Sequence, residues 1–120
     1  MKVRIKITDY FKSEAKPLLK KYHSLNDDLI NLEKQLLENP ELGTPLGNNS
    51  FKIRLKITSK GRGKSGGARV ITYLETELIA NVNITETGTI VNLLSIYDKS
   101  DTATITDKEL RRLIENIKRT

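Results

Sequence analysis

The segment "SKGRGKSGGARVITY" (59–73) contains Gly-Lys-Ser, which ends the phosphate-binding loop of many nucleotide-binding proteins. That loop has the pattern G-x-x-x-x-G-K-[ST], whose leading glycine opens the turn around the phosphates and which is followed by a helix. Gly63, Lys64 and Ser65 match the end of the pattern, but Thr58 stands where the leading glycine is required. The residues that follow are rich in β-branched and aromatic side chains, which favour a strand. The sequence therefore predicts a basic loop between strands and not a nucleotide pocket.

The positive charge of the chain is concentrated around this loop. Of the 21 lysines and arginines, seven fall within residues 51–74, a segment that contains no aspartate or glutamate. These seven residues are Lys52, Arg54, Lys56, Lys60, Arg62, Lys64 and Arg69. The remaining lysines and arginines are balanced by the 15 acidic residues, so the net charge of +6 arises from this one segment. Such a concentration is the electrostatic signature of a site for a polyanion.

Side chains of these types could also cleave RNA without a metal ion. RNA carries its own nucleophile, the 2′-OH, so the protein must accept that proton, stabilise charge on phosphorus and protonate the leaving 5′-oxygen. Arginine presents a planar fork to phosphate oxygens, and lysine or tyrosine can transfer protons when neighbouring cations lower the pKa. Arg69, Tyr97 and Lys99 lie at the ends of two predicted strands and could converge with this basic segment. Tyr97 could instead stack on a base.

Two simpler interpretations of the basic segment stay open. Alternating lysines and arginines could solvate an exposed strand face, although such a face normally mixes both signs of charge. The segment could also bind a nucleic-acid backbone without cleaving it. Metal chemistry is not expected, because the chain has no cysteine and a single histidine, His23, between two predicted helices. We therefore expect no cofactor.

The elements that must position these groups can be predicted from periodicity. Residues 2–8 and 51–57 alternate apolar and basic side chains, as half-buried strands do. Strands are also predicted over 68–82 and 89–99, the second of them apolar on both faces and hence central. Apolar residues recur at helical spacing from Phe11 to Tyr22, with Pro17 favouring a kink or a late start. A second helix is predicted after an N-cap at Ser24, and a third after the Thr106–Glu109 capping box.

The predicted order is β-α-α-β-β-β-α, which indicates an α+β fold with a helical hairpin packed on a mainly antiparallel β-sheet. A chain of 120 residues suffices for one compact domain, so we expect a single domain over 1–120. The N-terminal residues alternate in polarity and do not match a signal peptide, and no apolar run reaches the length of a membrane span. We expect a cytoplasmic protein that does not associate with membranes.

The segments "FKIRLKI", "GKSGGARVITY", "IVNLLSIYDKSD" and "ITDKEL" together resemble the RelE/ParE superfamily of bacterial toxins, especially its RelE/HigB-like branch. The early segment "AKPLLKKYHSLNDDLINLEKQLLENPELGTPLG" is similar to the helical hairpin of that branch, so the resemblance covers nearly the whole chain. It implies a microbial RNase-like fold, the activity of a ribosome-dependent mRNA endonuclease, and a toxin–antitoxin complex with a cognate antitoxin.

The resemblance also implies roles for individual residues. Arg69 matches the arginine that contacts the scissile phosphate, and we expect its guanidinium to be open to solvent. Lys64 matches the loop lysine, and Tyr97 and Lys99 match the C-terminal catalytic region. Lys52 and Arg54 match the basic strand that precedes the loop, and the concentration of positive charge extends the predicted RNA contacts to Lys56, Lys60 and Arg62.

The chain departs from the family in two ways. It offers no histidine at the site, which leaves proton transfer to lysine or tyrosine, and its segment 74–89 is longer than the usual hairpin. The main alternative within the superfamily is a ParE-like inhibitor of DNA gyrase. We favour RNA cleavage because the lysine, arginine and tyrosine set is present, since function follows the site and not the fold.

Overall fold

A computed structural model describes residues 2–60, 66–80, 85–100 and 104–118. The described residues form three α-helices and five strands, with one short 3-10 turn at Thr58–Lys60. In chain order the elements are β1 (Lys2–Ile7), α1 (Asp9–Lys21), α2 (Leu25–Glu38), β2 (Thr44–Gly47), β3 (Ser50–Leu55), β4 (Ala68–Ala80), β5 (Thr85–Asp98) and α3 (Asp107–Lys118). The predicted α+β class is confirmed.

The five strands form one mixed sheet in the order β1-β5-β4-β3-β2. Only β1 and β5 pair in parallel, and the other three pairings are antiparallel, as expected of a mainly antiparallel sheet. The predicted element order lacks β2, a short edge strand that contains Pro45. Proline cannot donate a hydrogen bond to a neighbouring strand but is tolerated on an edge strand. Its presence in this segment therefore argued against a strand when only the sequence was considered.

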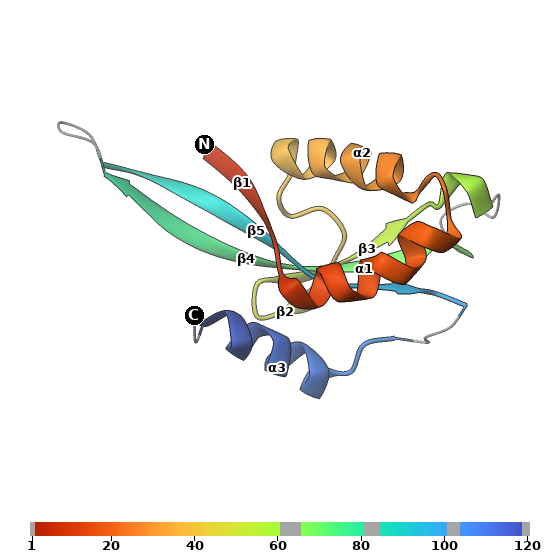
Figure 1. Cartoon of the computed structure of the whole chain (residues 1–120). Coiled ribbons are helices and arrows are strands. Elements are labelled where there is room, and N and C mark those ends of the chain that lie inside the picture. The colour runs from red at the N-terminus through yellow and green to blue at the C-terminus, as the bar shows by residue number, and fades with distance from the viewer. Residues whose placement is uncertain (1, 61–65, 81–84, 101–103, 119–120) are drawn as a thin grey trace.

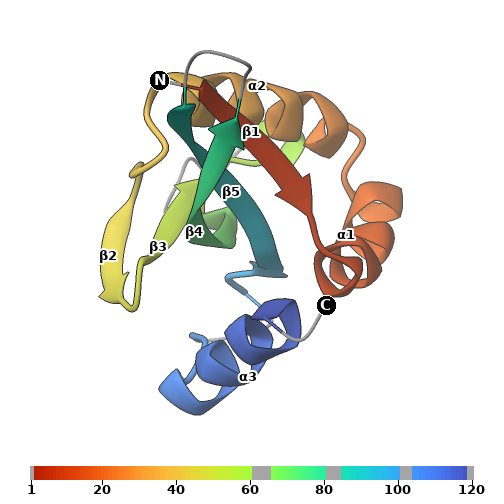
Figure 2. The same ribbon diagram turned by 90° about the vertical axis from the view of Figure 1, so that its left-hand side faces the viewer.

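The helices cover both faces of the sheet, as Figures 1 and 2 show. The hairpin of α1 and α2 packs on one face, where Phe11 and Leu36 meet Val70 in the larger apolar cluster. Helix α3 packs on the other face, where Leu113 meets Ile71 in a second cluster. Val70 and Ile71 are both fully buried although they point to opposite faces, which is the mark of a central strand.

The first helix begins earlier than predicted. The Thr8 side chain caps α1 by accepting a hydrogen bond from the Phe11 N–H at 3.1 Å, so the helix begins at Asp9. Pro17 lies inside α1, so of the two predicted alternatives, a kink or a late start, the late start was wrong. None of the described helices has the length and apolar character needed to cross a membrane.

The two other predicted caps had different outcomes. Ser24 stands before α2 but makes no capping hydrogen bond with its side chain. Ser24 is thus the N-cap residue of α2, as predicted, but its hydroxyl donates to the Asp28 carboxylate at 2.9 Å and does not cap the helix. At α3 the Thr106 hydroxyl accepts from the Glu109 N–H at 3.1 Å and donates to the Glu109 carboxylate at 3.0 Å, so the predicted cap is confirmed.

The long hairpin of β4 and β5 extends past the rest of the sheet (Figure 1). Pairing of β3 with β4 ends at Tyr73, and pairing of β1 with β5 ends at Gly88. The outer residues of the hairpin therefore pair only with each other among the described residues. This projection accounts for the extra length of segment 74–89 and contributes to the elongated dimensions of 51 × 29 × 23 Å.

Candidate nucleic-acid interface

The strand register brings three of the predicted site residues into one row. Arg54 on β3 lies directly opposite Arg69 on β4, and Arg69 lies directly opposite Tyr97 on β5. Directly opposite residues of antiparallel strands project from the same face of the sheet. These residues therefore form a continuous row across three strands, the Arg54–Arg69–Tyr97 row, on the face that α3 also covers.

Two lysines extend the row along the strands. Lys52 precedes Arg54 by two positions on β3, and side chains two positions apart on a strand share a face. Lys99 follows Tyr97 by two positions, just past the end of β5, and its N–H donates to the Gly67 carbonyl at 3.0 Å. That hydrogen bond continues the β4–β5 pairing and fixes the position of the Lys99 backbone. Four basic residues thus gather at one end of this face.

The members of this set differ in exposure. Arg54 and Lys99 are exposed and Lys52 is half-buried. Arg69, by contrast, is only 5% exposed, and its Nη1 donates to the Ala68 carbonyl at 3.2 Å. The expectation of an open Arg69 guanidinium was therefore wrong, because β4 is the middle strand and both its faces are covered. Tyr97 is 8% exposed, and its hydroxyl makes no hydrogen bond within the described part of the chain.

Lys60 belongs to a different part of the protein. Its Nζ lies 2.8 Å from the Asp98 carboxylate and 2.9 Å from the Ser100 hydroxyl, and its side chain is only 12% exposed. The Tyr22 hydroxyl donates to the same carboxylate at 2.6 Å. Lys60 therefore completes a buried ion pair, and its assignment as an RNA contact is corrected.

The same contacts determine the charge state of Asp98. Burial raises the pKa of this carboxyl, but the hydrogen bonds from Lys60, Ser100 and Tyr22 outweigh it and hold the pKa well below its ordinary value. A carboxylate that is fully charged and already paired does not compete for the arginines on the opposite face.

Three predicted residues remain. Lys56 is exposed and lies with Arg54 along a groove of about 190 Å³ between β3 and α2. Asp28 and Gln35 line the other side of this groove. Arg62 and Lys64 lie outside the described residues.

One functional candidate was missed by the sequence prediction. Glu14 on α1 points toward β5, where its Oε1 accepts hydrogen bonds from the Ser95 hydroxyl at 2.7 Å and the Ile96 N–H at 3.2 Å. Burial raises the pKa of this carboxyl, although these hydrogen bonds oppose the effect. A signal was present, because Glu14 interrupts the buried stripe that contains Phe11 and Leu18 on the same helix.

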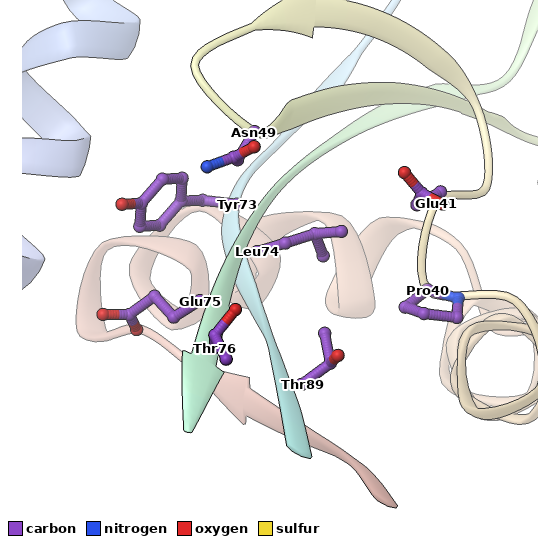
Figure 3. Close-up of a pocket in the computed structure, with 8 residues that line it drawn as sticks. All are labelled: Pro40, Glu41, Asn49, Tyr73, Leu74, Glu75, Thr76 and Thr89. Carbon is purple, nitrogen blue, oxygen red and sulfur yellow. The ribbon is translucent and has the colours of Figure 1, made fainter. Parts of the chain in front are cut away.

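One cavity is remote from the basic row. It has a volume of about 490 Å³ and lies at the outer edge of β4 just beyond the end of β3 (Figure 3). Its lining includes Glu41 and Glu75 but no lysine or arginine, so it is unsuited to a polyanion. Among the described residues, no three histidine, aspartate or glutamate side chains come together as metal ligands would.

A comparison of the sequence with protein-family models gives no match.

Proposed function

We propose that this chain is the toxin of a type II toxin–antitoxin system and that it cleaves mRNA on the ribosome in the cytoplasm. The observation that carries the proposal is the Arg54–Arg69–Tyr97 row, which places two arginines directly opposite each other beside a tyrosine. The resemblance of the sequence to RelE/HigB-like toxins supplies the biological role.

The row suits a phosphodiester. Side chains directly opposite on antiparallel strands have Cβ atoms roughly 4.5–5.5 Å apart, so two guanidinium groups can address the oxygens of a single phosphate. Arg54 is the exposed member and makes the first contact, while the buried Arg69 adds its charge from the neighbouring strand. Lys52 and Lys99 lie on either side and hold the adjoining backbone.

Cleavage then proceeds by attack of the 2′-OH on the adjacent phosphorus, which forms a 2′,3′-cyclic phosphate and releases the 5′-oxygen. Lys99 supplies an exposed amine for the proton transfers. Tyr97 supplies a hydroxyl that must become accessible when RNA binds, because it is buried in the free protein. The antitoxin inhibits by covering the exposed basic residues of this face, which would otherwise attract RNA of any sequence.

The test compares Arg54→Gln with Lys34→Gln, a matched loss of one exposed positive charge on α2. Removing one charged hydrogen-bonding group of about 1.5–3 kcal/mol should lower RNA cleavage by about 10- to 100-fold. The dependence of binding on salt should also fall, by about 0.7–0.9 in the slope of log K against log salt. Lys34→Gln should change neither quantity.

Chemical controls separate the alternatives. A 2′-deoxy substitution at the scissile nucleotide should abolish cutting, and continued cutting of that substrate would exclude 2′-OH attack. In cells, translation should fail first, with mRNA cut. If supercoiling fails first while mRNA stays intact, the chain is a gyrase inhibitor. RNA that is bound tightly and never cut, with or without ribosomes, would indicate a non-catalytic binding protein.

A further inference from the structure

The outer half of β4 forms an edge of the sheet that no other described strand covers. Strand β3 pairs with β4 as far as Tyr73, and the Leu74 N–H then donates to the Asn49 carbonyl at 2.9 Å. Beyond this point β4 continues to Ala80 and pairs, among the described residues, with β5 alone. We call residues 74–80 the outer β4 edge. It lies on the hairpin that projects past the rest of the sheet (Figure 1).

The direction of the backbone groups along this edge follows from the hydrogen bond of Leu74. Its N–H points toward β3, and backbone groups alternate in direction along a strand. The N–H and C=O groups of Thr76 and Leu78 therefore also point away from β5. In the described part of the chain, no backbone group outside the β4–β5 pairing bonds to either residue. Two donors and two acceptors thus stand ready for a further strand.

The two outermost strands of the sheet carry features that hinder strand addition, and the outer β4 edge does not. Strand β1 contains Lys2, Arg4 and Lys6, and β2 has only four residues, one of them Pro45. Short strands, lysine and proline are the usual means by which proteins prevent unwanted pairing at an edge. The outer β4 edge has the sequence LETELIA, without lysine, arginine or proline, and Leu78 is 71% exposed. Such an edge is suited to binding an added strand.

The cavity of about 490 Å³ described above lies beside this edge. Pro40 and Glu41, from the segment between α2 and β2, stand on one side of it, and Glu75 and Thr76 stand on the other (Figure 3). The charged residues of its lining are the two glutamates. A strand that continued the line of β3 along β4 would pass this cavity and could place a side chain in it.

The glutamates of the outer β4 edge differ in what they already bind. Arg4 donates to both carboxylate oxygens of Glu77, so that charge is paired. Glu75 accepts from the neutral amide of Asn92 at 2.8 Å, and it makes no ion pair within the described part of the chain. A lysine or arginine directly opposite Glu75 on an added strand would form a stabilising cross-strand pair.

We propose that the outer β4 edge binds an extended segment of a partner protein as an added strand, and that this segment alternates basic with β-branched residues. The basic residues lie on the face of Glu75, and the β-branched residues lie on the opposite face with Leu74 and Leu78. Backbone hydrogen bonds to Thr76 and Leu78 supply the affinity, and the two glutamates beside the cavity supply the specificity. The interface does not include the Arg54–Arg69–Tyr97 row, so it goes beyond RNA cleavage and does not depend on it.

The test follows amide hydrogen exchange of the full chain by NMR. The probe is the peptide Thr-Lys-Val-Lys-Val-Lys-Thr with blocked ends. An excess of this peptide should slow exchange of the Thr76 and Leu78 amides by at least about tenfold, because these N–H groups become hydrogen-bonded. The amides of Glu75 and Glu77 point toward β5 and should change less.

Two control peptides separate the backbone from the charge contribution on the wild-type chain. The valines are the residues whose N–H groups would face β4, so a peptide N-methylated at each valine should not bind. A peptide with glutamate in place of each lysine should bind roughly 5- to 10-fold more weakly, because attraction to Glu41 and Glu75 becomes repulsion.

Glu75→Gln should reduce the preference for the lysine peptide over the glutamate peptide. The Gln carbonyl can still accept from Asn92, so this variant should fold. Asp27→Asn is the matched control, because Asp27 is an exposed carboxylate in the first turn of α2, at the end of that helix remote from Pro40. It should keep the preference of the wild type.

Three results would overturn the proposal. The first is unchanged exchange of Thr76 and Leu78 in excess lysine peptide. The second is equal binding of the lysine and glutamate peptides by the wild type, which would refute the basic partner. The third is protection of the same amides in the protein alone that increases with protein concentration, which would assign the edge to a second copy of this chain. RNA cleavage by the wild type is measured separately, and its absence would leave the peptide results intact.

Discussion

Replacing Lys60 by methionine distinguishes a structural role of this lysine from a role in RNA binding. The substitution keeps most of the apolar stem and removes the ammonium group. In the folded protein that group lies 2.8 Å from the Asp98 carboxylate, and the two side chains are 12% and 1% exposed. The change therefore leaves a buried carboxylate without its cation.

The magnitude follows from the contacts that remain. Removing one partner of a buried ion pair costs about 3–5 kcal/mol of stability. Asp98 retains donors from Tyr22 and Ser100, so we expect the lower end, about 3 kcal/mol. In a chain of 120 residues, each kcal/mol shifts Tm by roughly 4 °C, which gives a fall of about 12 °C.

The assay measures thermal unfolding by circular dichroism and RNA binding at low temperature on the same samples. Lys56→Met is the control, because Lys56 is exposed and lies in the same basic segment. Lys56→Met should leave Tm nearly unchanged and weaken RNA binding. Lys60→Met should lower Tm and leave RNA binding nearly unchanged. An unchanged Tm together with lost RNA affinity for Lys60→Met would refute the structural role and restore Lys60 to the interface.

The pH dependence gives a second readout of the same pair. The pKa of Asp98 is held below its ordinary value of 3.8 in the folded protein. The folded state thus binds fewer protons than the unfolded state, and the resulting stability is present above that ordinary value and lost as pH falls below it. Lys60→Met removes one of the causes of this shift, so the acid-induced loss of stability should be smaller in the variant than in the wild type.

Two further predictions concern stability. Gly67→Ala should destabilise the fold by about 1–3 kcal/mol, because a Cβ there would overlap the Leu55 carbonyl oxygen. The free energy of unfolding is measured in urea. Gly47→Ala is the control, because Gly47 has a φ of +85° but open space around it, so this variant reports backbone strain alone. Glu14→Gln should leave Tm at pH 7 unchanged or higher, because burial raises the pKa of Glu14 above its ordinary 4.5 and so penalises the charged form. The gain in Tm should vanish below pH 4.5, where glutamate is itself protonated. A large loss of Tm at pH 7 would contradict this account.

The sequence predicted the elements of the sheet well because their periodicity is strong. The alternation of Ile53 and Arg54 and the apolar run of 89–99 determine strands, and the capping box at Thr106 determines where α3 starts. Strand β2 was not predicted, because a strand of four residues is too short to show an alternation of apolar and polar side chains and because it contains Pro45. The parallel pairing of β1 with β5 is a tertiary property that no local pattern specifies.

The site was harder to predict because burial depends on which elements cover a face. Arg69 was placed on the correct strand, and the register brings it beside Arg54. Its low exposure follows from the central position of β4, which the sequence does not specify. Lys60 lies in the same basic segment as Lys56, yet only the fold brings it to Asp98.

A single irregularity in β5 decides the composition of the interface. The pairing with β4 shifts register between Ile71 and Thr72, because Leu94 is an extra residue opposite them. Before this bulge the odd-numbered residues of β5, such as Leu93, face α1 and α2; after it the even-numbered Ile96 does. The face of every later residue is thereby exchanged.

The consequence lies at the end of the strand. With the bulge, Tyr97 joins Arg69 on the α3 face, and Asp98 falls on the opposite face with Lys60 and Tyr22. In an unbroken strand the two would change places, and a carboxylate would stand directly beside the arginines. Because Asp98 is turned to the opposite face and paired with Lys60, it does not stand beside the Arg54–Arg69–Tyr97 row. The bulge at Leu94 is therefore as much a part of the proposed site as the arginines.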